Sequence, residues 1–169
     1  RLLVEEGFEV WGTTRKREPN LSNLRTLAVD QSIQMVYLDL MDGRSIKENL
    51  KEIQPDHIYN LAAPSSVAQS FNYPAESVTS VAIGALNLLE AIARVVPESR
   101  YYQASSSEMF GNNNSPYQDE ETPFSPESPY AVGKVCAHSM TVIYRKQQDL
   151  FTSCGILFNH ESPLRPLHY

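Results

Sequence analysis

The chain reads HIYNLA at His57–Ala62, ESVTSVAIGALNLLEAIARV at Glu76–Val95 and SRYYQA at Ser99–Ala104. The first and third runs are short and largely apolar, which is typical of buried strands. The middle run is long enough for a helix and places Leu89 and Ile92 at helical spacing. A strand, a helix and a second strand in this order predict a right-handed βαβ unit with parallel strands.

The same alternation continues on both sides of this unit. Further strand-like and helical runs follow one another at 8–13, 21–28, 33–38, 45–53, 129–147 and 151–158. This pattern predicts an α/β fold, with a doubly wound parallel sheet in a single domain over residues 1–169. Because ligands of such sheets bind at the carboxyl ends of the strands, the residues after each strand carry most of the functional information.

The composition excludes some classes of partner. The 169 residues are 41% hydrophobic with a formal net charge of -6, which argues against nucleic acid as a partner. We find no apolar run near the roughly 20 residues that span a bilayer, so no membrane partner is expected. Cys136 and Cys154 have no metal-ligand spacing around them, so no metal site is predicted. We interpret both as buried free thiols, which fits a reducing compartment and a cytoplasmic location.

Four polar residues suggest a catalytic site. Tyr130 and Lys134 are four residues apart near a predicted helix start, so their side chains share one face. We expect the ammonium to lower the pKa of the tyrosine, so that its phenolate can remove a hydroxyl proton. Ser106 and Glu108 follow directly on the strand that ends at Ala104. A hydroxyl there can polarise a carbonyl, and a carboxylate can take a carbon-bound proton next to a ketone.

Each of these residues also has a purely structural interpretation. A tyrosine and a lysine can fall four apart by chance, and serines often cap turns. Glu108 can equally be a solvated loop charge. The coincidence of all four residues at one end of the predicted sheet favours the catalytic interpretation.

Three strings carry a family resemblance: YQASSSEMFG (Tyr102–Gly111), SPYAVGK (Ser128–Lys134) and GILFNHESP (Gly155–Pro163). With them the chain resembles the extended short-chain dehydrogenase/reductases and, within these, the GDP-mannose 4,6-dehydratase family. The resemblance covers essentially the whole chain and implies a Rossmann-like, NADP-binding domain truncated at both ends. The family's first strand with its glycine-rich phosphate loop is missing, as is most of its substrate domain. We therefore expect the 169 residues alone to be inactive and to bind NADP weakly or not at all.

The resemblance implies a role for each of the four polar residues. Tyr130 would be the base for hydride transfer from sugar C4, and Lys134 would tune it and bind the nicotinamide ribose. Glu108 would take the C5 proton. Ser106, where the family usually has threonine, would hydrogen-bond the reacting oxygen. Water would leave from C6 and the hydride would return there, converting GDP-mannose to GDP-4-keto-6-deoxymannose.

NADP is the cofactor that the resemblance implies. The basic run Thr14-Arg15-Lys16-Arg17 contains no acid where a free ribose hydroxyl would need one, and its cations suit a 2′-phosphate. A solvated basic turn is the alternative. The implied cofactor contacts are Arg15, Asp39, Leu40, Leu61, Ala62, Ala63, Ser65, Lys134, His160 and Arg165. The implied substrate contacts are Ser65, Ser106 and Asn159.

Two alternatives stay open at this point. One is another extended-family dehydratase or epimerase that acts on a dTDP- or UDP-sugar. The dTDP-glucose enzymes typically carry Asp-Glu at Ser107-Glu108 and epimerases generally lack the glutamate, so both differences favour the first interpretation. The other alternative is a non-catalytic dinucleotide-binding domain. Leu164 and Pro166 also break the family's usual Arg-Arg-Gly. The family implies a homo-oligomer, either a dimer or a tetramer.

Overall fold

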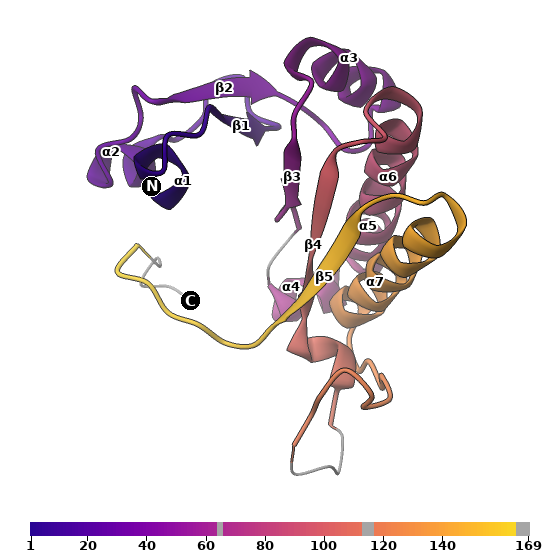
Figure 1. The fold of residues 1–169 in the computed structure, drawn as a ribbon. Coiled ribbons are helices and arrows are strands. Elements are labelled where there is room, and N and C mark those ends of the chain that lie inside the picture. The colour runs from indigo at the N-terminus through magenta and orange to yellow at the C-terminus, as the bar shows by residue number, and fades with distance from the viewer. Residues whose placement is uncertain (64–65, 113–116, 165–169) are drawn as a thin grey trace.

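The structure is a computed structural model that describes residues 1–63, 66–112 and 117–164. Within these residues, parallel strands form two sheets, one of two strands and one of three (Figure 1). The strands are β1 (Val10–Thr14), β2 (Ile33–Tyr37), β3 (His57–Asn60), β4 (Arg100–Ser106) and β5 (Thr152–Leu157). β1 pairs with β2, and β4 lies between β3 and β5. The predicted alternation of strands and helices is confirmed.

Helices connect these strands, as the sequence pattern predicts. They are α1 (Leu2–Glu5), α2 (Ser22–Thr26), α3 (Gly43–Ile53), α4 (Val67–Asn72), α5 (Pro74–Val78), α6 (Gly84–Val95) and α7 (Pro129–Gln147). A π-helical turn, η1 (Thr79–Ile83), joins α5 to α6, so the three form the single long helix expected from the sequence. A 3₁₀ turn, η2 (Ser107–Phe110), follows β4. The short helix α4 was not predicted.

The strand order in the two sheets matches two parts of the strand order of a doubly wound sheet. In the order 3-2-1-4-5-6 of such folds, the second and fourth strands flank the first. Here β2 and β1 match the third and second strands, and β3, β4 and β5 match the last three. The described residues supply no strand between β1 and β3. The parallel α/β fold is therefore as predicted, but its strands lie in two sheets because β1 and β3 share no hydrogen-bonding partner.

Side-chain caps fix where two helices begin. The Asp42 carboxylate accepts hydrogen bonds from the amides of Arg44 at 3.0 Å and Ser45 at 3.2 Å, so α3 begins slightly before its predicted start. The Ser128 hydroxyl accepts from the Ala131 amide at 3.1 Å, and Pro129 occupies the first turn of α7. The second cap sets the start of the helix that carries Tyr130.

The hydrophobic core lies between the three-stranded sheet and the helices on one of its faces (Figure 1). The buried members of this cluster are Ile46, Leu50, Leu88, Leu89, Ala91, Ile92, Val96, Tyr101 and Leu150. Residues of β4 alternate between its two faces. Tyr101, Gln103 and Ser105 point to the helices and are at most 3% exposed. On the other face, Tyr59 of β3, which pairs with Tyr102, is 52% exposed.

One helical run differs from the expectation that no segment could span a bilayer. The helix Pro74–Val95 has 22 residues and is long and apolar enough to cross a membrane, by length and composition alone. Its residues Leu88, Leu89 and Ile92 are buried in the core described above. The role of a core helix accounts for its apolar character.

Both cysteines are free, but the expectation that both are buried is wrong. Cys154 on β5 is half-buried, and Cys136 is exposed. The reason is the orientation of α7, which turns Ala137 and Thr141 toward the sheet and leaves Cys136 on its outer side.

Truncation of Leu89 is expected to cause the large loss of stability typical of a core cavity. Leu89 is 0% exposed, and Leu89→Ala should lower the free energy of unfolding by about 2–5 kcal/mol. Ile83, on the same helical run, is 41% exposed and provides the control, with an expected change of about 0.5 kcal/mol or less for Ile83→Ala. Urea denaturation followed by circular dichroism measures both. Equal losses would contradict this assignment of the core.

Candidate active site

Three of the predicted catalytic residues meet at the carboxyl end of β4. Ser106 ends this strand with 8% of its surface exposed, Glu108 follows in η2, and Tyr130 lies in the first turn of α7. The Ser106 hydroxyl accepts a hydrogen bond from the Glu108 amide at 3.2 Å and is close enough to the Tyr130 side chain to lower its pKa. Ser106 thus caps a turn, as the structural interpretation expected, and also contacts the tyrosine, as the catalytic interpretation requires.

The pKa of Tyr130 is raised, mainly by burial and to a smaller extent by the charge of Glu108. The proximity of Ser106 opposes this shift. The expectation that Lys134 lowers the pKa of Tyr130 is therefore wrong for this structure. The physical reason is the position of the ammonium, which lies 5.6 Å from the centre of the tyrosine ring and is bonded elsewhere.

Lys134 is 4% exposed and donates from Nζ to the backbone carbonyl of Ala104 at 2.8 Å. Burial lowers the pKa of Lys134 to about 8, because the charged ammonium loses hydration. With this pKa, Lys134 loses its proton at a pH much closer to neutral than an exposed lysine does. It lies one helical turn beyond Tyr130, as the spacing predicts, and its ammonium reaches the backbone of the strand that carries Ser106.

The exposed carboxylate of Glu108 faces a groove of about 540 Å³. The groove is lined by Val67, Phe71, Ser107, Glu108, Gly111, Asn112, Gln118, Glu127, Ser128 and Phe158. Its aromatic, amide, hydroxyl and carboxylate groups suit a polar ring compound such as a sugar. Sequence reasoning did not single out Phe71, Gln118, Glu127 or Phe158, which come from segments far apart in the chain.

The predicted cofactor residues lie at the carboxyl ends of successive strands. Arg15 is exposed directly after β1, and Asp39 and Leu40 follow β2. Asn87 of α6 donates to the Leu40 carbonyl at 2.8 Å, which ties this loop to the core helix. Leu61, 65% exposed, begins the loop after β3 that continues through Ala62 and Ala63. Cations, a carboxylate and small apolar residues at the carboxyl ends of β1, β2 and β3 fit a dinucleotide.

The remaining predicted contacts lie in or near the C-terminal segment. Asn159 and His160 are exposed beyond β5, where the chain leaves the sheet (Figure 1), and the His160 ring lies 2.9 Å from the Phe158 carbonyl. Their substrate and cofactor roles stay predictions. Ser65 and Arg165 lie outside the described residues. Among the residues that the structure describes, no three His, Cys, Asp or Glu side chains are placed to hold a metal ion.

A contact that the sequence did not reveal anchors the loop before α7. The Ser105 hydroxyl lies 3.0 Å from Nδ1 of His138, and the His138 ring packs edge-on against Phe124, 5.2 Å away. Phe124 in turn lies 5.5 Å from Phe110 of η2. Burial, followed by the charge of Arg145, lowers the pKa of His138, which favours its neutral form. His138 is thus a packing residue beneath the site.

Solved structures define the class of protein. The chain superposes on a putative epimerase from Burkholderia cenocepacia with a TM-score of 0.85 and 22% identity, over 99% of this chain and 52% of that one. A dTDP-glucose 4,6-dehydratase from Bacillus anthracis, solved with NAD, gives a TM-score of 0.83 and 23% identity over the same shares. Together with the strand order, these similarities show a doubly wound, Rossmann-type α/β fold.

Sequence comparison identifies the family. The family profile described as GDP-mannose 4,6 dehydratase matches residues 1–169, so the chain belongs to the GDP-mannose 4,6-dehydratase family. GDP-mannose 4,6 dehydratase 1 of Arabidopsis thaliana is 46% identical over 96% of this chain and 48% of its own length. GDP-mannose 4,6-dehydratase of Vibrio cholerae is 42% identical over 96% of this chain and 46% of its own length. The chain therefore spans about half the length of the curated relatives it matches.

Proposed function

We propose that this chain is the NADP-binding, catalytic domain of an enzyme that dehydrates GDP-mannose to GDP-4-keto-6-deoxymannose. The observation that supports this most strongly is the placement of Glu108, whose carboxylate faces the groove while its backbone amide bonds the Ser106 hydroxyl beside Tyr130. An oxidoreductase of this fold needs the serine, tyrosine and lysine. A carboxylate beside them adds a base for the proton next to a ketone, which dehydration requires.

The residues divide the proton transfers between them. Tyr130 takes the proton of the sugar C4 hydroxyl, and Ser106, which lies close to Tyr130, holds the same oxygen as it becomes a carbonyl. Glu108 then removes the proton from C5, which the new ketone has acidified, and passes it to the departing C6 hydroxyl, which leaves as water. The proton held by Tyr130 returns to C5 when the hydride is restored at C6. NADP, which Lys134 would hold at the nicotinamide ribose, would supply a temporary hydride acceptor. The overall reaction involves no net redox change.

Lys134 serves the tyrosine and the cofactor in this proposal. Its ammonium has a pKa of about 8 and so gives up a proton far more readily than an exposed lysine. The raised pKa of Tyr130 means that this residue depends on nearby positive charge to lose its own proton. We assign the nicotinamide ribose to Lys134, and the adenosine end to the residues after β1, β2 and β3.

A comparison of nucleotide sugars tests the proposed substrate. The full-length protein that contains this chain is incubated with NADP and, in parallel, GDP-mannose, dTDP-glucose or UDP-glucose, and each sugar is followed by NMR for a C6 methyl group. We expect the methyl signal from GDP-mannose. A methyl signal from dTDP-glucose instead would keep the reaction and overturn the substrate.

Loss of the basic run after β1 is expected to change the choice of cofactor. Arg15→Ala should weaken NADP binding about tenfold while leaving NAD binding nearly unchanged, because a charge-assisted hydrogen bond to a phosphate is lost. Arg44→Ala is the control, since Arg44 is exposed on α3 and pairs with Glu48 at 2.7 Å. Titration of the full-length protein that contains this chain with each dinucleotide measures both affinities. Equal weakening of NAD and NADP binding would contradict the assignment of Arg15 to the 2′-phosphate.

A further inference from the structure

Three polar side chains are fully buried within the hydrophobic core beside β3 and β4. Asn60, Tyr101 and Gln103 are 5%, 1% and 2% exposed. Asn60 donates from Nδ2 to the Tyr101 oxygen at 3.1 Å and to Oε1 of Gln103 at 2.9 Å. The Tyr101 hydroxyl donates to the same Oε1 atom at 2.5 Å. Burial of polar groups is unfavourable unless they are bonded, so this cluster is stable only as a complete set.

The cluster fixes the orientation of the Gln103 amide. Its Oε1 atom accepts from both Asn60 and Tyr101, so the amide nitrogen must point the other way. Nε2 donates to the carbonyl of Ala104 at 3.0 Å. A flipped amide would place its NH₂ group against the Asn60 donor and would lose these bonds.

The Ala104 carbonyl also accepts the hydrogen bond from Lys134. Its oxygen accepts from the Gln103 amide at 3.0 Å and from the Lys134 ammonium at 2.8 Å. At the other end of the cluster, Oδ1 of Asn60 accepts from the Ala62 amide at 3.2 Å, in the loop after β3. One hydrogen-bonded path thus runs from the buried lysine to a loop at the carboxyl end of the sheet.

We propose that Asn60, Tyr101 and Gln103 are a positioning unit that sets how strongly the Ala104 carbonyl holds Lys134. The inference rests on the proposed role of Lys134 in the reaction, and none of the three residues is assigned a contact with the substrate. The hydrogen bond from the neutral Gln103 amide draws electron density from the Ala104 carbonyl oxygen. That oxygen therefore stabilises the Lys134 ammonium less than it would without the amide. The lysine is thereby kept in place without being locked in its charged form.

Few other titratable groups among the described residues surround Lys134 and could affect its protonation. Tyr130 lies one turn before it and His138 one turn after it on α7, and Glu108 lies in η2 near Tyr130. The lowered pKa of Lys134 has burial as its cause. A change in the donor to the Ala104 carbonyl should therefore be visible in the titration of Lys134.

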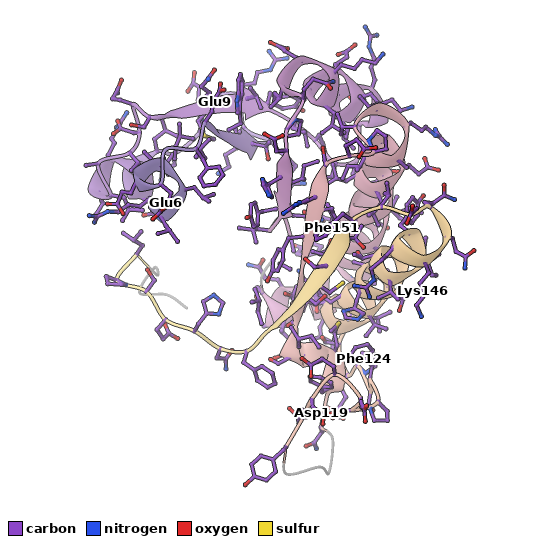
Figure 2. All side chains as sticks on the ribbon, in the orientation of Figure 1. Glu6, Glu9, Asp119, Phe124, Lys146 and Phe151 are labelled. Carbon is purple, nitrogen blue, oxygen red and sulfur yellow. The ribbon has the colours of Figure 1, made fainter. Side chains whose placement is uncertain are left out.

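Gln103→Met tests the proposal, because it keeps the length of the side chain and removes its amide. With lysine labelled at Cε with ¹³C, the pKa of Lys134 is read from an NMR titration and assigned with Lys134→Arg. We expect that pKa to rise by about half a unit, a roughly threefold change in the acid dissociation constant. Lys146, exposed near the end of α7 (Figure 2), should not shift and is the internal control.

Thr152→Val is the matched control variant. Thr152 is 4% exposed on β5 and donates to the Thr141 carbonyl at 3.0 Å. The substitution therefore removes a buried hydrogen bond that has no link to Lys134. It should lower stability and leave the Lys134 pKa unchanged. If Gln103→Met does not fold, Tyr101→Phe tests the proposal in its place. It removes one of the two donors that orient Gln103, so it should raise the Lys134 pKa by a smaller amount.

An unchanged Lys134 pKa in the folded variant would overturn the positioning unit, as would the same shift in Thr152→Val. The titration is independent of the reaction. A wild-type protein that turns over no nucleotide sugar, but in which Gln103→Met raises the Lys134 pKa, would refute the proposed function and support the positioning unit. The reverse pattern would support the function and refute the unit.

Discussion

Glu108→Gln is expected to stop the reaction after oxidation at C4. The amide keeps the size of the side chain but cannot remove the C5 proton, so formation of the C6 methyl group should fall by about 10²–10⁴-fold. Tyr130, Ser106 and Lys134 are unchanged, so the C4 ketone should still form. Mass spectrometry of the acid-quenched sugar is expected to find a ketone that retains its C6 hydroxyl.

Glu127→Gln is the matched control for this prediction. Glu127 is an exposed glutamate that lines the same groove, but no role in proton transfer is assigned to it. We expect its substitution to change turnover by much less than that of Glu108. Equal losses in the two variants would mean that the negative charge of the groove matters, and that Glu108 is not a specific base.

Tyr130→Phe is expected to block the reaction at its first step. Without the phenol no group takes the C4 hydroxyl proton, so both the ketone and the methyl group should disappear, with turnover reduced by about 10²–10⁴-fold. The raised pKa of Tyr130 adds a pH signature in the wild type. Because the base form of a group with a raised pKa is gained only as pH rises, turnover should increase toward alkaline pH.

Tyr144→Phe provides the control on the same helix. Tyr144 is half-buried near the end of α7, and burial raises its pKa as well, but it lies far along the helix from Ser106. The variant should keep the turnover and the pH profile of the wild type. A Tyr130→Phe protein that still formed the C4 ketone would contradict the assignment of the base.

The sequence predicted where the proposed catalytic residues lie, because their placement follows local rules. A polar run directly after a buried strand must lie at the sheet edge, and a spacing of four puts Tyr130 and Lys134 on one helical face. Ser106, Glu108 and Tyr130 accordingly meet in the structure. The family strings added the chemical roles, which spacing alone does not provide.

What the sequence did not predict depends on tertiary contacts. The ammonium of Lys134 donates to the backbone carbonyl of Ala104. Every residue has such a carbonyl, so the sequence does not indicate which one the lysine reaches. The pKa of Tyr130 rises because the fold buries it, whereas the spacing pointed only to the neighbouring cation. Gln103 and Asn60 become partners through the parallel register of β3 and β4, which pairs Asn60 with Gln103.

One measurement tests the central claim most directly. The full-length protein that contains this chain and its Glu108→Gln variant are each incubated with GDP-mannose and NADP, and the sugar is followed by NMR. The proposed function predicts a C6 methyl signal that grows in the wild type and is absent, on the same time scale, in Glu108→Gln. A methyl signal that grows equally in both proteins, or no methyl signal from GDP-mannose in the wild type, would contradict it.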